Sequence, residues 1–170
     1  GIPDPELVRR FDRPGPRYTS YPTAVEFHAG VGERDYREHL ALADRELAGT
    51  PLSLYVHIPF CAKHCSYCGC HVIPTSRRDL AAEYLDYLGR ELEQVAELLP
   101  RRRRLNQMHW GGGTPTYLDP AQLEQLYALV ARHFELPADA ERAIEVDPRV
   151  TTSEHLETLA RLGFNRLSFG

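Results

Sequence analysis

Residues 55–70 read YVHIPFCAKHCSYCGC, and this stretch holds every cysteine of the 170-residue chain: Cys61, Cys65, Cys68 and Cys70. Disulfide bonds stabilise a fold mainly by closing long loops, which so tight a group of cysteines cannot do. The stretch also continues an alternating, strand-like segment, LSLYVHI at 52–58, which is bounded by prolines. We therefore expect a ligand-binding loop at the end of a first β-strand.

From residue 52 onward, strand-like and helix-like segments alternate. Strands are predicted at 52–58, 105–110, 142–147 and 165–170, and helices at 77–99, 119–134 and 153–163. Asp119 and Ser153 are the expected helix caps. This order predicts an α/β fold with right-handed crossovers and a parallel sheet, in which ligands bind at the carboxyl ends of the strands. The cysteine segment, GGGTP (111–115) and Asp147 follow the first three strands, so we expect them at one edge of the sheet.

The alternation within the strands predicts which face of the sheet packs against helices. Val56 and Ile58 would lie on the helix side of the first strand, opposite Tyr55 and His57. By the same reasoning the other two strands turn polar side chains to that opposite face: Gln107, His109, Glu145 and Asp147. Such a face predicts a cavity for a polar ligand rather than a filled barrel core.

The first fifty residues differ from the rest of the chain. Residues 1–30 are rich in Pro, Gly and Tyr without a sustained period, whereas 33–47 have a helical pattern. We therefore predict two parts, an irregular to helical N-terminal extension at 1–50 and the start of a barrel at 51–170.

Composition limits the class of protein. A formal net charge of -4 and a pI of about 6.1 argue against a partner held by nucleic-acid phosphates. The chain has no apolar run long enough to cross a bilayer and no secretory signal pattern. We therefore expect a cytoplasmic protein without nucleic-acid or membrane partners, with its cysteines present as thiols or metal thiolates.

The cysteine spacing leaves three kinds of site open. The three thiolates of C-x₃-C-x₂-C can hold three irons of a cubane iron–sulfur cluster and leave the fourth iron for another ligand. A zinc site is the second reading, although structural zinc sites favour two separated cysteine pairs and this chain has one. The third is a redox C-x-x-C formed by Cys65 and Cys68, which Cys61 and Cys70 fit poorly.

C-x₃-C-x₂-C after a first β-strand resembles the radical S-adenosylmethionine (radical SAM) enzymes. RYTSYPTA, YVHIPFC, CGC, HWGGGTPTYL, IEVDPR and GFNRLS together resemble one family among them, the oxygen-independent coproporphyrinogen III oxidases of haem biosynthesis. The similarity runs from about Gly15 to Gly170. It implies a radical SAM partial (β/α) barrel, truncated here after about four strands, so that the chain is expected to be an N-terminal fragment and inactive alone.

The resemblance also implies roles for individual residues. Cys61, Cys65 and Cys68 match the ligands of a [4Fe-4S] cluster, and Cys70 matches an extra cysteine that is not a ligand. The positions that match contacts to S-adenosylmethionine are Tyr55, Tyr67, Gly112, Gly113, Thr114 and Glu145. The residues support this in part, because glycines let backbone N–H groups approach a ligand and Glu145 can accept hydrogen bonds from a ribose or an ammonium.

The activity that the resemblance implies is a radical oxidative decarboxylation. Two propionate side chains of coproporphyrinogen III would become vinyl groups, giving protoporphyrinogen IX, with an electron donor and an electron acceptor as further partners. Two alternatives stay open. A haem chaperone of the same superfamily typically has an aromatic residue at the position of Cys70 and lacks RYTSYPTA, and a non-enzymatic zinc module would need only the cysteines.

Overall fold

The computed structural model describes residues 4–12 and 23–170, which form two compact units, Gly1–Tyr36 and Arg37–Gly170. The first unit contains α1 (Pro5–Phe11), capped by the Asp4 side chain, and the short η1 (Ala24–Glu26). The helix α2 (Glu33–Glu46), within which the division between the units falls, confirms the helix predicted at 33–47. Most of RYTSYPTA, including Tyr18 and Tyr21, lies outside the described residues. The predicted division at residue 50 stays a prediction.

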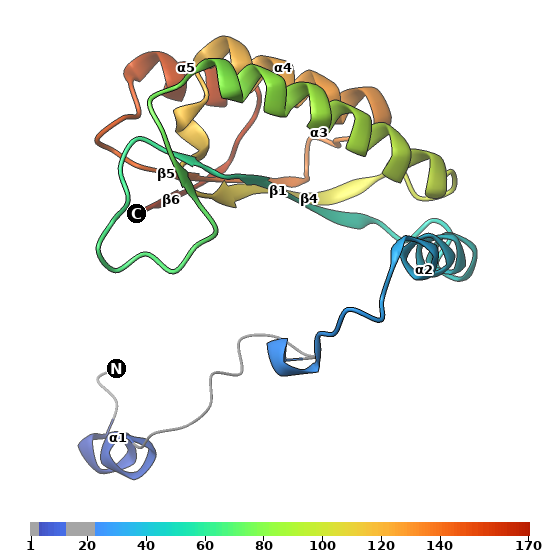
Figure 1. The fold of residues 1–170 in the computed structure, drawn as a ribbon, viewed down its shortest axis with the longest axis horizontal. Coiled ribbons are helices and arrows are strands. Elements are labelled where there is room, and N and C mark those ends of the chain that lie inside the picture. Colours follow the sequence, from blue (N-terminus) through green and yellow to red (C-terminus); the bar gives the residue numbers. More distant parts are fainter. Residues whose placement is uncertain (1–3, 13–22) are drawn as a thin grey trace. The chain divides into compact units, whose positions relative to one another are not determined.

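The second unit is built on a four-stranded parallel sheet with the order β1-β4-β5-β6 (Figure 1). Its strands are β1 (Leu52–Ile58), β4 (Leu105–Gly112), β5 (Glu141–Val146) and β6 (Arg166–Phe169). Its helices are α3 (Asp79–Leu98), α4 (Pro120–His133) and α5 (Ser153–Arg161), and all three lie on the same side of the sheet in Figure 1. The predicted α/β order is therefore confirmed.

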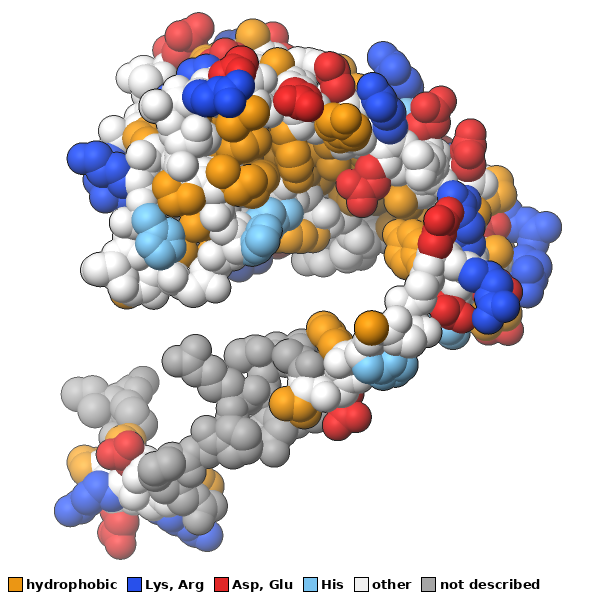
Figure 2. Space-filling model, in the orientation of Figure 1, with side chains coloured by type: hydrophobic (Ala, Val, Ile, Leu, Met, Phe, Trp, Pro, Cys, Tyr) orange, Lys and Arg blue, Asp and Glu red, His pale blue; other side chains and the backbone are white. Residues whose placement is uncertain are grey.

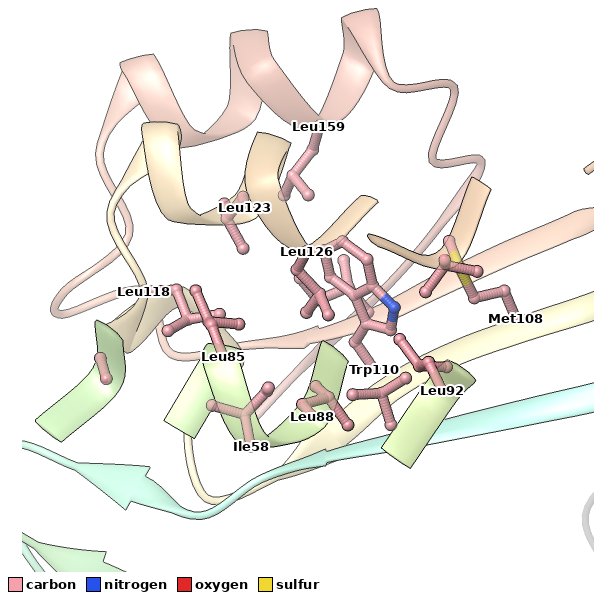
Figure 3. Close-up of a cluster of buried hydrophobic side chains, with 14 of the residues drawn as sticks. Ile58, Leu85, Leu88, Leu92, Met108, Trp110, Leu118, Leu123, Leu126 and Leu159 are labelled. Atoms are coloured by element: carbon pink, nitrogen blue, oxygen red, sulfur yellow. The ribbon is translucent and has the colours of Figure 1, made fainter. Parts of the chain in front are cut away.

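The core lies between the sheet and these helices. Figure 3 shows side chains of both layers meeting there, with Met108 and Trp110 of β4 in the same cluster as Leu88 and Leu92 of α3. The expected helix-side residues Val56 and Ile58 are buried, and so are Ile144 and Val146 of β5. The buried residues of α3 are Ala81, Leu85, Leu88, Leu92 and Ala96, and Leu80, Tyr84 and Val95 of the same helix are partly buried. The helix contacts α4, and its buried side chains belong to the same core cluster as those of the sheet, so its apolar face is broad.

The outer surface of the helical layer is charged. Figure 2 shows Lys and Arg side chains interspersed with Asp and Glu side chains over this layer. Within the described residues, no helix is both long enough and apolar enough to span a bilayer.

Three local features differ from the prediction. The strand expected at 105–110 continues through Gly111 and Gly112, because these glycines pair with His57 and Ile58 of β1. Two short strands, β2 (Phe60–Cys61) and β3 (Ile73–Pro74), pair in parallel at the two ends of the cysteine loop. A short helical turn, η2 (Pro115–Tyr117), follows the glycines.

The cap of α5 is Thr152, and the prediction of Ser153 was wrong by one residue. The Thr152 side chain accepts the His155 backbone N–H, and the His155 side chain accepts the Thr152 N–H in return. Gly163, with φ +78°, follows the last turn of the helix and ends it.

Replacing Thr152 by alanine should lower the free energy of unfolding by about 1 kcal/mol, since it removes this cap. Ser153→Ala is the matched control and should leave stability nearly unchanged, because Ser153 is exposed and lies inside the first turn. Urea denaturation of the two variants measures the difference. Equal destabilisation by both changes would contradict the assignment of the cap.

Candidate functional site

A cavity of about 310 Å³ opens at the carboxyl-terminal edge of the sheet. The four cysteines, the Gly112–Thr114 turn, Glu145 and Asp147 all contribute to its wall, so the predicted convergence on one edge is confirmed. Of the residues proposed for the site, eight line this cavity: Cys61, Cys65, Cys68, Tyr67, Gly112, Gly113, Thr114 and Glu145. Tyr55 is the ninth, and it is not part of this lining.

Cys61 is the most firmly held of the four cysteines. It lies in β2, is only 8% exposed, and its carbonyl oxygen accepts the Thr75 N–H at 2.9 Å. Its sulfur lies 3.4 Å from the hydroxyl oxygen of Thr114. The β2–β3 pair therefore fixes the first thiol against the turn that follows β4.

The other three cysteines lie in the loop between β2 and β3. The Cys68 N–H donates to the Cys65 carbonyl oxygen at 3.1 Å, which folds the loop into a turn. Cys65 and Cys68 are half-buried, whereas Cys70 is exposed, and all four thiols are free. A hydrogen bond with the Cys68 side chain, followed by the charge of Cys68, raises the pKa of the Cys70 thiol. Among the described residues, no three His, Cys, Asp or Glu side chains are grouped closely enough to hold one metal ion.

Two of the three glycines are required by their surroundings. Gly112 has φ +114°, and a Cβ there would lie 2.6 Å from the His57 ring. A Cβ on Gly113 would lie 2.7 Å from the Phe60 carbonyl oxygen and 2.8 Å from that of Pro59. The turn after β4 therefore lies directly against the chain that leads into the cysteine loop.

The backbone N–H groups of this turn are used inside the protein. Gly113 donates to the Ile58 carbonyl oxygen and Thr114 to that of Phe60, both at 2.8 Å. Gly112 donates to the Glu145 carboxylate at 3.2 Å. The expectation that these N–H groups approach a ligand therefore fits poorly, and their clear contribution is to hold the cysteine loop and Glu145.

Glu145 lies on the face of the sheet opposite the helices, as predicted. One carboxylate oxygen is 3.2 Å from Nε2 of His109, and the other accepts the Gly112 N–H. The side chain remains 44% exposed, so both oxygens keep the capacity to accept further hydrogen bonds from a ligand.

The two tyrosines proposed for the site lie in different surroundings. Tyr67 lines the cavity from the cysteine loop and is 85% exposed. Tyr55 lies on β1, where its hydroxyl hydrogen-bonds with Nδ1 of His57 at 3.0 Å and its ring stacks on that of His109. Burial, and secondarily the charge of Glu145, raises the pKa of Tyr55. Tyr55 thus contacts His57 and His109, and His109 in turn contacts Glu145.

Arg149 is a residue of the site that sequence reasoning missed. It follows β5, lines the cavity, and binds the Asp147 carboxylate through Nε at 2.9 Å and Nη2 at 2.7 Å. The same Nη2 lies 3.7 Å from the sulfur of Cys65. The hydrogen bond with Arg149 lowers the pKa of Asp147, and its counterpart raises the pKa of Arg149. The sequence feature that could have identified Arg149 is its position two residues after Asp147, which ends the predicted third strand.

Comparisons with known proteins agree with this geometry. Residues 55–170 match the model of the radical SAM superfamily. The chain is 49% identical over 169 residues to an oxygen-independent coproporphyrinogen III oxidase of Pseudomonas aeruginosa, and 47% identical over 167 residues to one of Escherichia coli. These matches cover 98% of this chain and 36% and 35% of the relatives, so the chain spans about a third of their length.

Two further matches concern a shorter relative and a solved structure. A protein of the same name from Mannheimia haemolytica is 45% identical over 145 residues, which cover 85% of this chain and 96% of the relative. The solved coproporphyrinogen III oxidase of E. coli, described as a radical SAM enzyme, superposes with a TM-score of 0.84 at 46% identity, over 98% of this chain and 36% of that one. By these matches the chain belongs to the radical SAM superfamily and, within it, to the family of oxygen-independent coproporphyrinogen III oxidases.

Proposed function

We propose that this chain holds a [4Fe-4S] cluster through Cys61, Cys65 and Cys68, and that it binds S-adenosylmethionine in the adjoining cavity. Its proposed activity is the oxidative decarboxylation of coproporphyrinogen III, in keeping with relatives named oxygen-independent coproporphyrinogen III oxidase. One observation carries the proposal: three thiols, the glycine turn and Glu145 come from separate strand ends and line one cavity.

The donor set fits an iron–sulfur cluster. Cluster irons are bound by thiolates, and here one loop supplies three free thiols beside the cavity. Cys61 is fixed by β2, whereas Cys65 and Cys68 lie in a turn closed by the hydrogen bond from the Cys68 N–H to the Cys65 carbonyl oxygen. The exposed Cys70 is the cysteine that we propose to remain free.

Glu145 is suited to a polar end of S-adenosylmethionine. The Glu145 carboxylate, held by His109 and Gly112, would accept hydrogen bonds from an ammonium or a ribose hydroxyl. The other proposed contacts that line the cavity are Tyr67, Gly112, Gly113 and Thr114. Tyr55 is proposed as a contact of S-adenosylmethionine from the resemblance. Its ring stacks on His109, which contacts Glu145, so Tyr55 would also help to position that carboxylate.

When bound, the reduced cluster supplies the electron that cleaves S-adenosylmethionine and starts radical chemistry on the substrate propionates. This chain's residues would position the cofactors and shield them from water. An electron donor and an electron acceptor are further partners of the proposed reaction. Four free thiols suit a reducing compartment, and we propose the cytoplasm. We also propose residues 1–50 as an extension of the barrel part at 51–170.

Anaerobic reconstitution with iron and sulfide tests the cofactor proposal. We expect a cubane EPR signal from the reduced chain, and a change of that signal on addition of S-adenosylmethionine, because the fourth iron lacks a cysteine ligand. A signal indifferent to S-adenosylmethionine would contradict the cavity assignment. Zinc bound in place of a cluster would contradict the cofactor proposal as a whole.

A chimera tests the substrate. Residues 1–170 would replace the matching third of the E. coli relative, and release of carbon dioxide from coproporphyrinogen III would be measured with S-adenosylmethionine, a reductant and an electron acceptor. We expect activity close to that of the parent. A chimera that binds the cluster and cleaves S-adenosylmethionine without releasing carbon dioxide would argue against the shared substrate.

A further inference from the structure

Arg149 approaches the cysteine loop from a distant part of the chain. The Asp147 carboxylate binds its guanidinium through two nitrogens, and the Arg149 backbone N–H donates to the same carboxylate at 2.9 Å. The Asp147 side chain is only 14% exposed, so the anchor is itself held in place. These contacts fix the direction of the guanidinium at the wall of the cavity.

Nη2 of Arg149 is shared between this anchor and a thiol. It lies 2.7 Å from a carboxylate oxygen of Asp147 and 3.7 Å from the Cys65 sulfur, within reach of an N–H···S hydrogen bond. The fork of the guanidinium explains how one side chain serves both partners, since its N–H groups diverge in a fixed plane. Although Arg149 is 65% exposed, its charged end is held by this geometry.

We infer that Arg149 is a positioning residue that raises the reduction potential of the cluster by donating a hydrogen bond to the sulfur of Cys65. This inference rests on the proposed function, in which Cys65 is a cluster ligand. The potentials of iron–sulfur clusters depend on net charge and on hydrogen bonds to the sulfurs. The reduced cluster carries one more electron, so a nearby N–H dipole and positive charge stabilise it relative to the oxidised form.

The pairing with Asp147 determines whether the N–H dipole or the positive charge of Arg149 contributes more to the reduction potential. Asp147 and Arg149 form a pair whose charges cancel at longer range, which reduces the general electrostatic contribution of the arginine. The directed N–H group remains, because it faces the sulfur at short range. A replacement that keeps the charge but not the fork should therefore behave differently from the native arginine.

The test is an EPR-monitored redox titration of the reconstituted chain. In Arg149→Gln we expect the ratio of reduced to oxidised cluster at a fixed potential to fall about threefold, which is a shift of about 28 mV to lower potential for a one-electron couple. Arg149→Lys should show most of this shift, because lysine cannot bind Asp147 and Cys65 in the same fork geometry. Arg161→Gln, which removes from α5 a cation paired with Glu124 of α4, is the matched control and should titrate like the native chain.

The possible results separate this inference from the proposed function. Absence of a cluster in the native chain would overturn the proposed function. Native iron content in all variants with an unchanged potential in Arg149→Gln would overturn the inference alone. An equal shift in Arg161→Gln, or a native potential in Arg149→Lys, would assign the effect to net charge and overturn the role of the hydrogen bond.

Discussion

Alanine in place of Cys61, Cys65 or Cys68, one change at a time, is expected to remove nearly all cluster-bound iron after anaerobic reconstitution. A cubane held by three thiolates has no spare protein ligand, so the loss of one leaves a second iron open. Cys61→Ala should have the largest effect, because this thiol lies in β2 and is buried against Thr114. Iron and sulfide content, together with the EPR signal of the reduced chain, measure the result.

Cys70→Ala is the matched control for these three variants. Cys70 also lines the cavity, so the structure brings four thiols to the site, and the choice of three depends on spacing and on the exposure of Cys70. We expect Cys70→Ala to keep native iron content. Loss of the cluster in Cys70→Ala, with retention in any of the other three, would show that the ligand set is different.

The burial pattern of the sheet could be predicted because it depends on which of the two faces of the sheet the helices cover. Val56 and Ile58 are buried and Tyr55 and His57 are not, as the alternation in β1 indicates. Helices cover one side of this sheet, so apolar residues collect on that side and the polar residues that form the site remain on the other.

The contacts that shape the site could not be predicted, because they join distant segments. The β2–β3 pair has two residues in each strand, too few for a periodic signal. Arg149 meets Cys65 across 84 positions of the chain. The backbone N–H groups of the glycine turn bond to β1 and β2, and nothing within GGGTP indicates those partners.

Tyr55 illustrates the limit of a resemblance between sequences. It lies three residues before the end of β1, which corresponds to about 10 Å of strand length. Its hydrogen-bond and ring contacts are accordingly with His57 and His109. Its proposed contact with S-adenosylmethionine remains a prediction.

Gly113→Ala is expected to lower the free energy of unfolding by about 3 kcal/mol, near the upper end of what overpacking costs. The added Cβ would lie 2.7–2.8 Å from two carbonyl oxygens, and these are backbone atoms that cannot turn away as a flexible side chain would. To relieve the clash, the turn must separate from Pro59 and Phe60, which weakens the bonds from Gly113 and Thr114 to β1 and β2. Chemical denaturation measures the loss of stability, and iron content after reconstitution measures its effect on the loop.

Gly69→Ala separates this clash from a general effect of replacing glycine in the site. Gly69 lies in the cysteine loop between Cys68 and Cys70, and a Cβ there would meet nothing within 4 Å. Its stability and iron content should therefore stay close to native. If Gly113→Ala were as stable as Gly69→Ala, the close approach of the turn to Pro59 and Phe60 would be wrong, and with it the account of how Cys61 is held. If Gly113→Ala lost stability but kept native iron content, the turn would support the fold without being needed to fix the first thiol.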